Sequence, residues 1–216
     1  MDLSSYPVHE SLSVQQGKDI YRTEEWHKAV VQYQFESDRD TLETAVYLWH
    51  NHEDGWKRKN KYVIKSTEAW EDDRPVINWM FDTLEESPAG PNVRKLPVSD
   101  YFSVRHAQTI FKSDEWWKAI VHVDQKGDYE TNEIIIYLWQ MSDGEWRRRQ
   151  KYAIKSEDDW QKERNIISEF LGVPTEEYAK TLTEDDGILG DIESEFEPHR
   201  EENHVSETIS EQQNIT

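Results

Sequence analysis

The same succession of hydrophobic and polar positions occurs twice along the chain. Residues 28–35 and 118–123 alternate between apolar and polar side chains, which is the period of a half-buried β-strand. Residues 44–49 and 134–139 are apolar on both faces and rich in β-branched and aromatic types, as in a central strand. An offset of 90 residues superimposes both pairs of segments. The pattern therefore predicts an internal duplication.

Weaker signals complete the strands of each unit. Short apolar segments indicate a first strand or its second half, at 12–14 and 20–22 and again at 102–104 and 110–112. Polar residues predict a turn between the second and third strands, at 37–40 and 126–129. An Asp-Gly pair predicts a hairpin turn into a basic fourth strand, at 54–55 and 143–144. Each unit thus reads as a four-stranded antiparallel meander.

The period then changes from that of a strand to that of a helix. Ser66 and Ser156 precede the helical pattern as N-caps. Trp70 and Trp160 lie on the apolar stripe of each helix and are expected to anchor the helix on the sheet. Pro75 predicts a kink or a restart of the first helix at the preceding residue.

These elements give an α+β fold of two tandem ββββα units. The predicted divisions are a first unit at 1–86, a linker at 87–96, a second unit at 97–173 and an acidic tail at 174–216. The tail has few aromatic residues and many charges, which is typical of disorder, with a short helix expected near 188–196.

The fourth strand of each unit carries the candidate binding residues. Alternation along a regular strand places Lys57, Lys59 and Lys61 on one face, and Arg147, Arg149 and Lys151 on the corresponding face of the second unit. Tyr47 and Trp49, with Tyr137 and Trp139, share a face of the neighbouring third strand. Cations that contact phosphates beside rings that stack on bases would bind a single nucleic-acid strand. A basic edge strand also prevents edge-to-edge aggregation, and this alternative stays open.

Charge is unevenly distributed along the chain. Residues 174–216 contain 13 acidic residues against Lys180 and Arg200, so this segment carries −11 of the formal net charge of −20. The tail therefore serves as a solubilising extension, or it imitates nucleic acid and competes for the basic strands.

Several function classes find no support in the sequence. The chain contains no cysteine, so disulfides and thiolate metal sites are excluded. His50 and His52 have no histidine counterparts in the second unit, which argues against a duplicated metal site. No nucleophilic triad or glycine-rich phosphate loop stands out, so we expect no enzyme, no catalytic residue and no cofactor. No long apolar run or signal peptide is apparent, which predicts a cytoplasmic protein, associated with the nucleoid in a prokaryote.

The segment 150–160, within a longer similar stretch at 118–167, resembles the transcriptional coactivator family called positive cofactor four. That resemblance implies ββββα units that pair through their helices and sheets that bind single-stranded DNA. Two units in one chain then imply an intramolecular pseudo-dimer, as in the plant Whirly proteins. The family's basic positions match Lys57, Lys61, Arg147 and Lys151, and its strand-end aromatic matches Trp49 and Trp139. The family's glycine is replaced by Tyr62 and Tyr152.

The resulting expectation is a protein that binds single-stranded DNA, or RNA, with little sequence preference. A role as a transcription, replication or repair cofactor would bring protein partners of those processes, and no membrane is involved. The chain is expected as a monomeric pseudo-dimer or a higher homo-oligomer. The alternative is an acidic protein–protein interaction scaffold that uses the same fold without nucleic acid.

Overall fold

The computed structural model describes residues 3–83, 96–125 and 132–174. The predicted linker, apart from Leu96, and the tail beyond Pro174 lie outside the described residues. The turn predicted at 126–129 lies outside them as well. Within the described ranges, no helix is long and apolar enough to cross a membrane.

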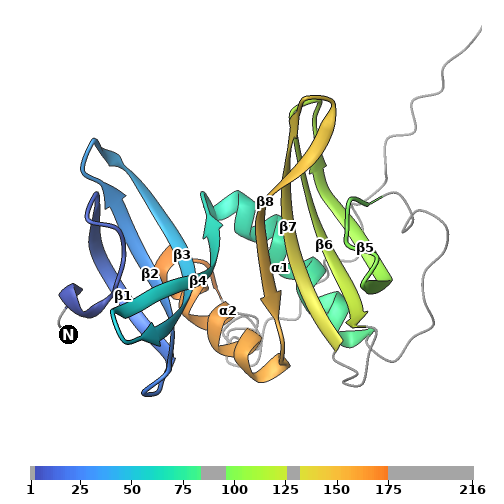
Figure 1. Ribbon diagram of the computed structural model, residues 1–216. Helices are drawn as coiled ribbons and strands as arrows, with labels where there is room; N and C mark the ends of the chain where they lie inside the picture. The colour runs from blue at the N-terminus through green and yellow to red at the C-terminus, as the bar shows by residue number, and fades with distance from the viewer. Residues whose placement is uncertain (1–2, 84–95, 126–131, 175–216) are drawn as a thin grey trace, which may run out of the picture.

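The first unit is a four-stranded antiparallel meander followed by a helix (Figure 1). After a 3₁₀ turn, η1 (Leu3–Ser5), it contains β1 (Leu12–Arg22), β2 (Trp26–Phe35), β3 (Asp38–His52), β4 (Gly55–Ile64) and α1 (Thr67–Asp82). The second unit repeats the order with β5 (Phe102–Lys112), β6 (Trp116–Gln125), β7 (Asn132–Ser142), β8 (Glu145–Ile154) and α2 (Glu157–Leu171). The predicted fold class is therefore confirmed.

Local signals in the sequence fix the turns and the helix starts. The turn between β7 and β8 has positive φ at Asp143 and at Gly144, 55° and 78°, as the favoured two-residue hairpin requires. The side chains of the predicted N-caps accept a hydrogen bond from the backbone, Ser66 from the N–H of Ala69 and Ser156 from that of Asp159.

Three boundaries differ from the prediction. The two segments predicted around a first strand form one continuous strand, β1, with two register shifts against β2. Asp38 already belongs to β3, so the polar turn before it is shorter than expected. Pro75 lies inside α1, which runs as one helix from Thr67 to Asp82 without a restart. Burial of Ile77 and Met80 beyond the proline stabilises the helix across the missing N–H.

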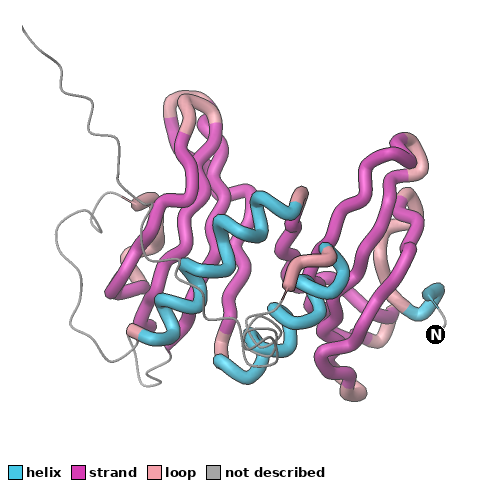
Figure 2. Tube along the Cα trace, turned by 180° about the vertical axis from the view of Figure 1, so that it is seen from behind, coloured by secondary structure: helices cyan, strands magenta, loops and turns pink. Residues whose placement is uncertain are grey.

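The two units exchange their helices (Figure 2). The α1 helix packs on β5 and β6 of the second sheet, whereas α2 packs on β1, β2 and β3 of the first. One hydrophobic core results, with buried side chains from both units. The helix of the other unit covers part of the helix-side face of each sheet. The two units therefore depend on each other for a complete core.

Equivalent residues of the two units meet at the centre of this core. The rings of Tyr62 and Tyr152 stack at a centroid distance of 5.5 Å, and those of Trp70 and Trp160 lie 5.5 Å apart. All four side chains are buried. The prediction that the two tryptophans are core anchors is therefore confirmed, and each equivalent pair lies on a pseudo-twofold axis.

Polar contacts across the units repeat the same relation. Trp70 donates its indole N–H to Ser168 Oγ at 3.2 Å, and Trp160 donates to Asn78 Oδ1 at 2.8 Å. These acceptors are 90 residues apart, as the donors are. Matched partners for the buried indoles make the exchanged arrangement specific.

The opposite face of each sheet is covered too. Tyr33, Tyr47 and Trp49 form a second core beneath the N-terminal segment, in contact with Tyr6 and Leu3. The second sheet has the equivalent core of Trp117, Tyr137 and Trp139, covered by Leu96 and Val98. Burial on both faces explains why the third strand of each unit is apolar at successive positions.

A buried ion pair joins α1 to the second sheet. Lys118 of β6 donates to Asp73 of α1, which also accepts a hydrogen bond from Tyr62. The Asp73 side chain is 1% exposed. Burial raises the pKa of Asp73, while Lys118 and then Tyr62 act in the opposite direction.

Replacing Asp73 with Ala should destabilise the fold, because the largely buried charge of Lys118 would lose its partner. Removal of one member of a buried pair costs about 3–5 kcal/mol. The free energy of unfolding in urea measures the loss, and Glu71→Ala, at an exposed position of the same helix, is the control. Equal stability of the two variants would contradict a role for this ion pair in holding the exchanged helix.

Candidate nucleic-acid interface

The two basic strands, β4 and β8, lie side by side at the centre of the molecule (Figure 1). Each is the last strand in the order of its sheet, so each presents one edge that has no hydrogen-bonded neighbour within the sheet. The two edges do not join into a single sheet. A groove of about 730 Å³ lies between them.

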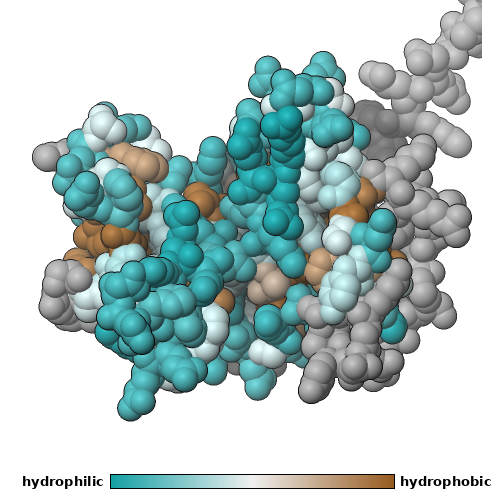
Figure 3. All heavy atoms as spheres, viewed as in Figure 1, coloured by the Kyte–Doolittle hydropathy of each residue, from teal (hydrophilic) through white to brown (hydrophobic). Residues whose placement is uncertain are grey.

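The lining of this groove, here called the basic groove, is strongly cationic. Among the described residues that line it, seven are basic and one is acidic. The basic residues are Arg58, Lys59 and Lys61 from β4, Arg148, Arg149 and Lys151 from β8, and Lys155 just beyond β8. The acidic residue is Glu133, whose carboxylate lies 3.7 Å from Lys155 Nζ. The surface over the centre of this face is accordingly hydrophilic (Figure 3).

A β-bulge in each basic strand corrects the predicted arrangement of the cations. Leu48 pairs with Asn60 and Trp49 pairs with Arg58, so Lys59 has no partner on β3. The second unit has the same bulge at Arg149. An extra residue reverses the alternation of side chains on either side of it. The regular alternation that placed Lys57 and Lys61 on one face is therefore wrong.

The bulge places the cations on particular faces of the strand. Lys61 pairs with Tyr47, and Arg58 with Trp49, so both cations share the aromatic face of the sheet. Lys57 pairs with His50 on the opposite, helix-side face. Because the bulge reverses the alternation, Trp56 and Val63, which are an odd number of residues apart, both pack on the core at the aromatic face of the sheet.

Lys61 is held by a chain of polar groups. Its Nζ donates to the phenol oxygen of Tyr33 at 2.7 Å, and that phenol donates to Glu43 at 2.7 Å. Its ammonium also lies 4.6 Å and 5.0 Å from the ring centroids of Tyr33 and Tyr47. Burial lowers the pKa of Lys61 to about 8, an effect that Glu43 opposes and Arg58 reinforces.

The equivalent lysine of the second unit is held by a different ring. Val123 stands where the first unit has Tyr33, so no phenol is present at that position. Lys151 instead lies 4.6 Å from the ring centroid of Phe102, which replaces Leu12 of the first unit. Burial lowers the pKa of Lys151 as well, with Glu133 opposing. Both units thus place a lysine over an aromatic ring at the groove.

Arg58, Lys59 and Arg148 are exposed and form no ion pair with other described residues. Arg149 donates to Gln140 Oε1 at 2.9 Å, an uncharged partner. The charge of these four side chains is therefore available to an external anion. Facing rows of like charge also keep the two strand edges apart.

Two predicted cations lie outside the groove lining. Lys57 forms an ion pair with Asp54 at an N–O distance of 2.7 Å, and Arg147 forms one with Asp143 at 2.8 Å. Both ion pairs lie next to the hairpin turn. Neither residue lines the groove. Of the six predicted cations, the structure brings together Lys59, Lys61, Arg149 and Lys151.

The four aromatic residues predicted to stack on bases are in the core. Tyr47 and Tyr137 are each 2% exposed, Trp49 is fully buried and Trp139 is 1% exposed. Tyr47 stacks on Trp49, and Tyr137 on Trp139, both with centroids 4.9 Å apart. No ring face is left for a base, so the structure gives these residues a packing role instead.

Arg58, Arg148 and Lys155 belong to the groove although the sequence reasoning did not select them. Regular alternation would place the two arginines on the face opposite the predicted cations. The sequence carries no clear signal of the bulge, because Trp56 lies an even number of residues from Tyr62 and Ile64, as in a regular strand. Regular alternation places Lys155 on the same face as Arg149 and Lys151, but it is not among the predicted phosphate contacts.

Among the described residues, no group of three or more histidine or carboxylate side chains is arranged to hold a metal ion. Comparison with protein-family models, with curated proteins and with solved structures finds no match for this chain. The structure establishes two tandem four-stranded sheets, each followed by a helix.

The depressed pKa of Lys61 is directly measurable. In protein whose lysines carry ¹³C-methyl groups, one NMR signal should titrate with a pKa of about 8 and disappear in Lys61→Arg. Arg58→Ala should raise this pKa, because a neighbouring positive charge is removed, and Glu43→Gln should lower it further. Titration of every lysine near the usual value of 10.5 would contradict the described environment of Lys61.

Proposed function

We propose that the protein binds single-stranded nucleic acid along the basic groove between β4 and β8. The observation that carries this proposal is the ratio of seven basic residues to one acidic residue among the described residues that line one groove. In a chain with a formal net charge of −20, such a concentration of positive charge is a local feature rather than a consequence of composition. Phosphates are the anions whose regular spacing suits a row of cations along a strand.

The shape of the groove favours one strand over a duplex. Its volume of about 730 Å³ falls in the range of small-ligand pockets, roughly 300–1,000 Å³, so we expect a single strand to fit it better than the bulkier duplex. A polyanion between β4 and β8 would also relieve the repulsion between their cations. Single-stranded DNA is the proposed ligand, and RNA offers the same phosphates.

Binding through phosphates alone gives little sequence preference. The aromatic residues once expected to stack on bases are buried, and none of the described residues that line the groove is aromatic, so base stacking adds no sequence preference. The affinity should therefore come from the release of counterions and should depend steeply on salt.

The architecture supports the proposal independently. The order of elements, and the packing of two ββββα units through their helices, are what the resemblance to positive cofactor four and the Whirly proteins implies. A cofactor role in transcription, replication or repair accords with such binding. The intramolecular pseudo-dimer provides two basic strands in one chain, which the family obtains from two subunits.

Fluorescence anisotropy of a labelled single-stranded oligonucleotide tests the proposal. Binding should weaken strongly between about 50 and 200 mM salt, and duplex of the same sequence should compete poorly. Replacing Arg58 and Arg148 with Ala should reduce the slope of log affinity against log salt by about 1.4, or roughly 0.7 for each lost phosphate contact. Replacing both with Glu should abolish binding.

The matched control is Lys57→Ala combined with Arg147→Ala. It removes the same formal charge, but from residues that pair with turn aspartates outside the groove. A smaller effect of the control supports binding in the groove. Equal effects of both double variants would indicate diffuse electrostatics, and no salt-sensitive binding would favour the protein-interaction scaffold instead.

A further inference from the structure

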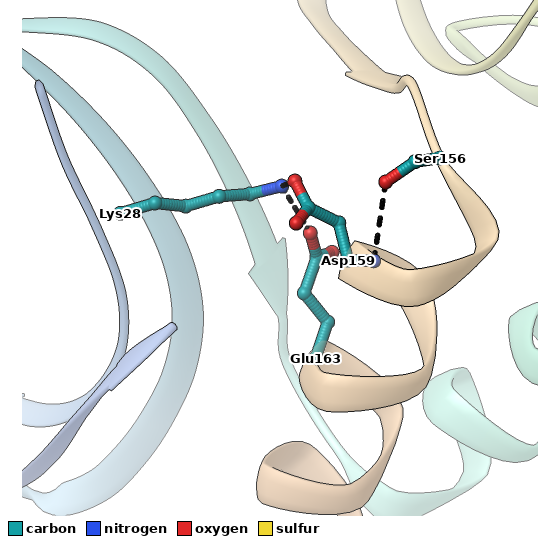
Figure 4. Close-up of polar contacts among 4 residues, drawn as sticks. All are labelled: Lys28, Ser156, Asp159 and Glu163. Carbon is teal, nitrogen blue, oxygen red and sulfur yellow. Dashed lines mark hydrogen bonds and ion pairs between the residues drawn. The ribbon is translucent and has the colours of Figure 1, made fainter. Parts of the chain in front are cut away.

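Two lysines related by the duplication, Lys28 and Lys118, have unequal surroundings. Lys28 of β2 reaches α2, where its Nζ lies 2.5 Å from Glu163 and 3.0 Å from Asp159 (Figure 4). Burial would lower the pKa of Lys28, but Glu163 and then Asp159 raise it above 10.5. Lys28 is 5% exposed. One half of the molecule thus satisfies its buried ammonium with two carboxylates.

The other half lacks the second carboxylate. Lys118 pairs with Asp73, the counterpart of Glu163, and this is its one ion pair among the described residues. The counterpart of Asp159 is Ala69, at the same position after the N-cap of α1. A methyl group therefore stands where the symmetric site places an anion.

A pocket of about 510 Å³ lies at this position. Ala69 and Lys118 both line it, together with the apolar side chains Val63, Phe111, Trp116 and Leu138 and the polar residues Glu43, Lys65, Ser113 and Gln150. Phe111 is 46% exposed, whereas its counterpart Tyr21 is half-buried beside Lys28. The two halves therefore differ in openness at equivalent positions.

We propose that this pocket binds a small organic acid with an apolar body. The carboxylate would take the place beside Lys118 that Asp159 takes beside Lys28, and the ring or chain would lie against Phe111, Trp116 and Leu138. Lys65 adds a second positive charge to the lining, and Glu43 adds one negative charge. The volume lies within the range of small-molecule sites, roughly 300–1,000 Å³. The site differs from the basic groove, although Val63 and Gln150 line both.

Isothermal titration calorimetry of the full-length chain with naphthalene-2-carboxylate tests this site. We expect one ligand per chain and at least about tenfold weaker binding of naphthalene-2-carboxamide, which has the same rings but no charge. Equal binding of acid and amide, or no binding of the acid, would overturn the proposal. The titration requires no nucleic acid in the basic groove. Its result therefore does not depend on whether the protein binds nucleic acid.

Two substitutions exploit the internal symmetry. Ala69→Asp copies the closed half and should abolish binding, whereas Asp159→Ala copies the open half and should give two ligands per chain. Glu71→Ala, on the exposed side of α1, should bind one ligand. Wild-type binding by Ala69→Asp would overturn the proposal. If thermal denaturation shows that this variant does not fold, Asp159→Ala decides: two sites support the proposal and one site overturns it.

Discussion

The exchange of helices between the two units is the constraint on which the rest of the structure depends. Each sheet packs one face against the helix of the other unit, so apolar side chains of both units are buried in one shared core. Hydrophobic burial is not directional. The arrangement becomes specific because buried charged groups find ion-pair partners across the units, as Lys28 does on α2 and Lys118 on α1.

The same exchange creates the basic groove. When the helices cross, β4 and β8 come together as the inner edges of their sheets, and two cationic strands that are 90 residues apart in sequence face each other. Their charges keep these edges from pairing and leave a space that a polyanion can enter. A structural device against edge pairing and a binding surface are thus compatible uses of the same residues.

Much of the fold could be predicted from the sequence because its signals are local. The central strands, the hairpin turn at Asp143 and the N-caps Ser66 and Ser156 follow from patterns within a few residues. The exchange of the helices could not be predicted in this way. An apolar stripe such as that of Trp70 specifies that a helix is buried, but it does not specify the sheet that buries it.

The candidate site was predicted only in part for a related reason. Charge alone identified the basic strands, but the face of each cation depends on register, and one bulged residue at Lys59 reverses it. Aromatic content was misleading as well. Tyr47 and Trp49 looked available on one face of a strand, whereas the N-terminal segment and the strand's neighbours bury that face.

The central claim is that a nucleic-acid strand lies between β4 and β8. Because the chain contains no cysteine, a single photo-crosslinking group can be attached through Lys59→Cys in the groove or through Glu71→Cys on α1. Irradiation with a single-stranded oligonucleotide should then give a crosslinked product from position 59 and little or none from position 71. Equal yields from both positions, or a product from position 71 alone, would contradict the account.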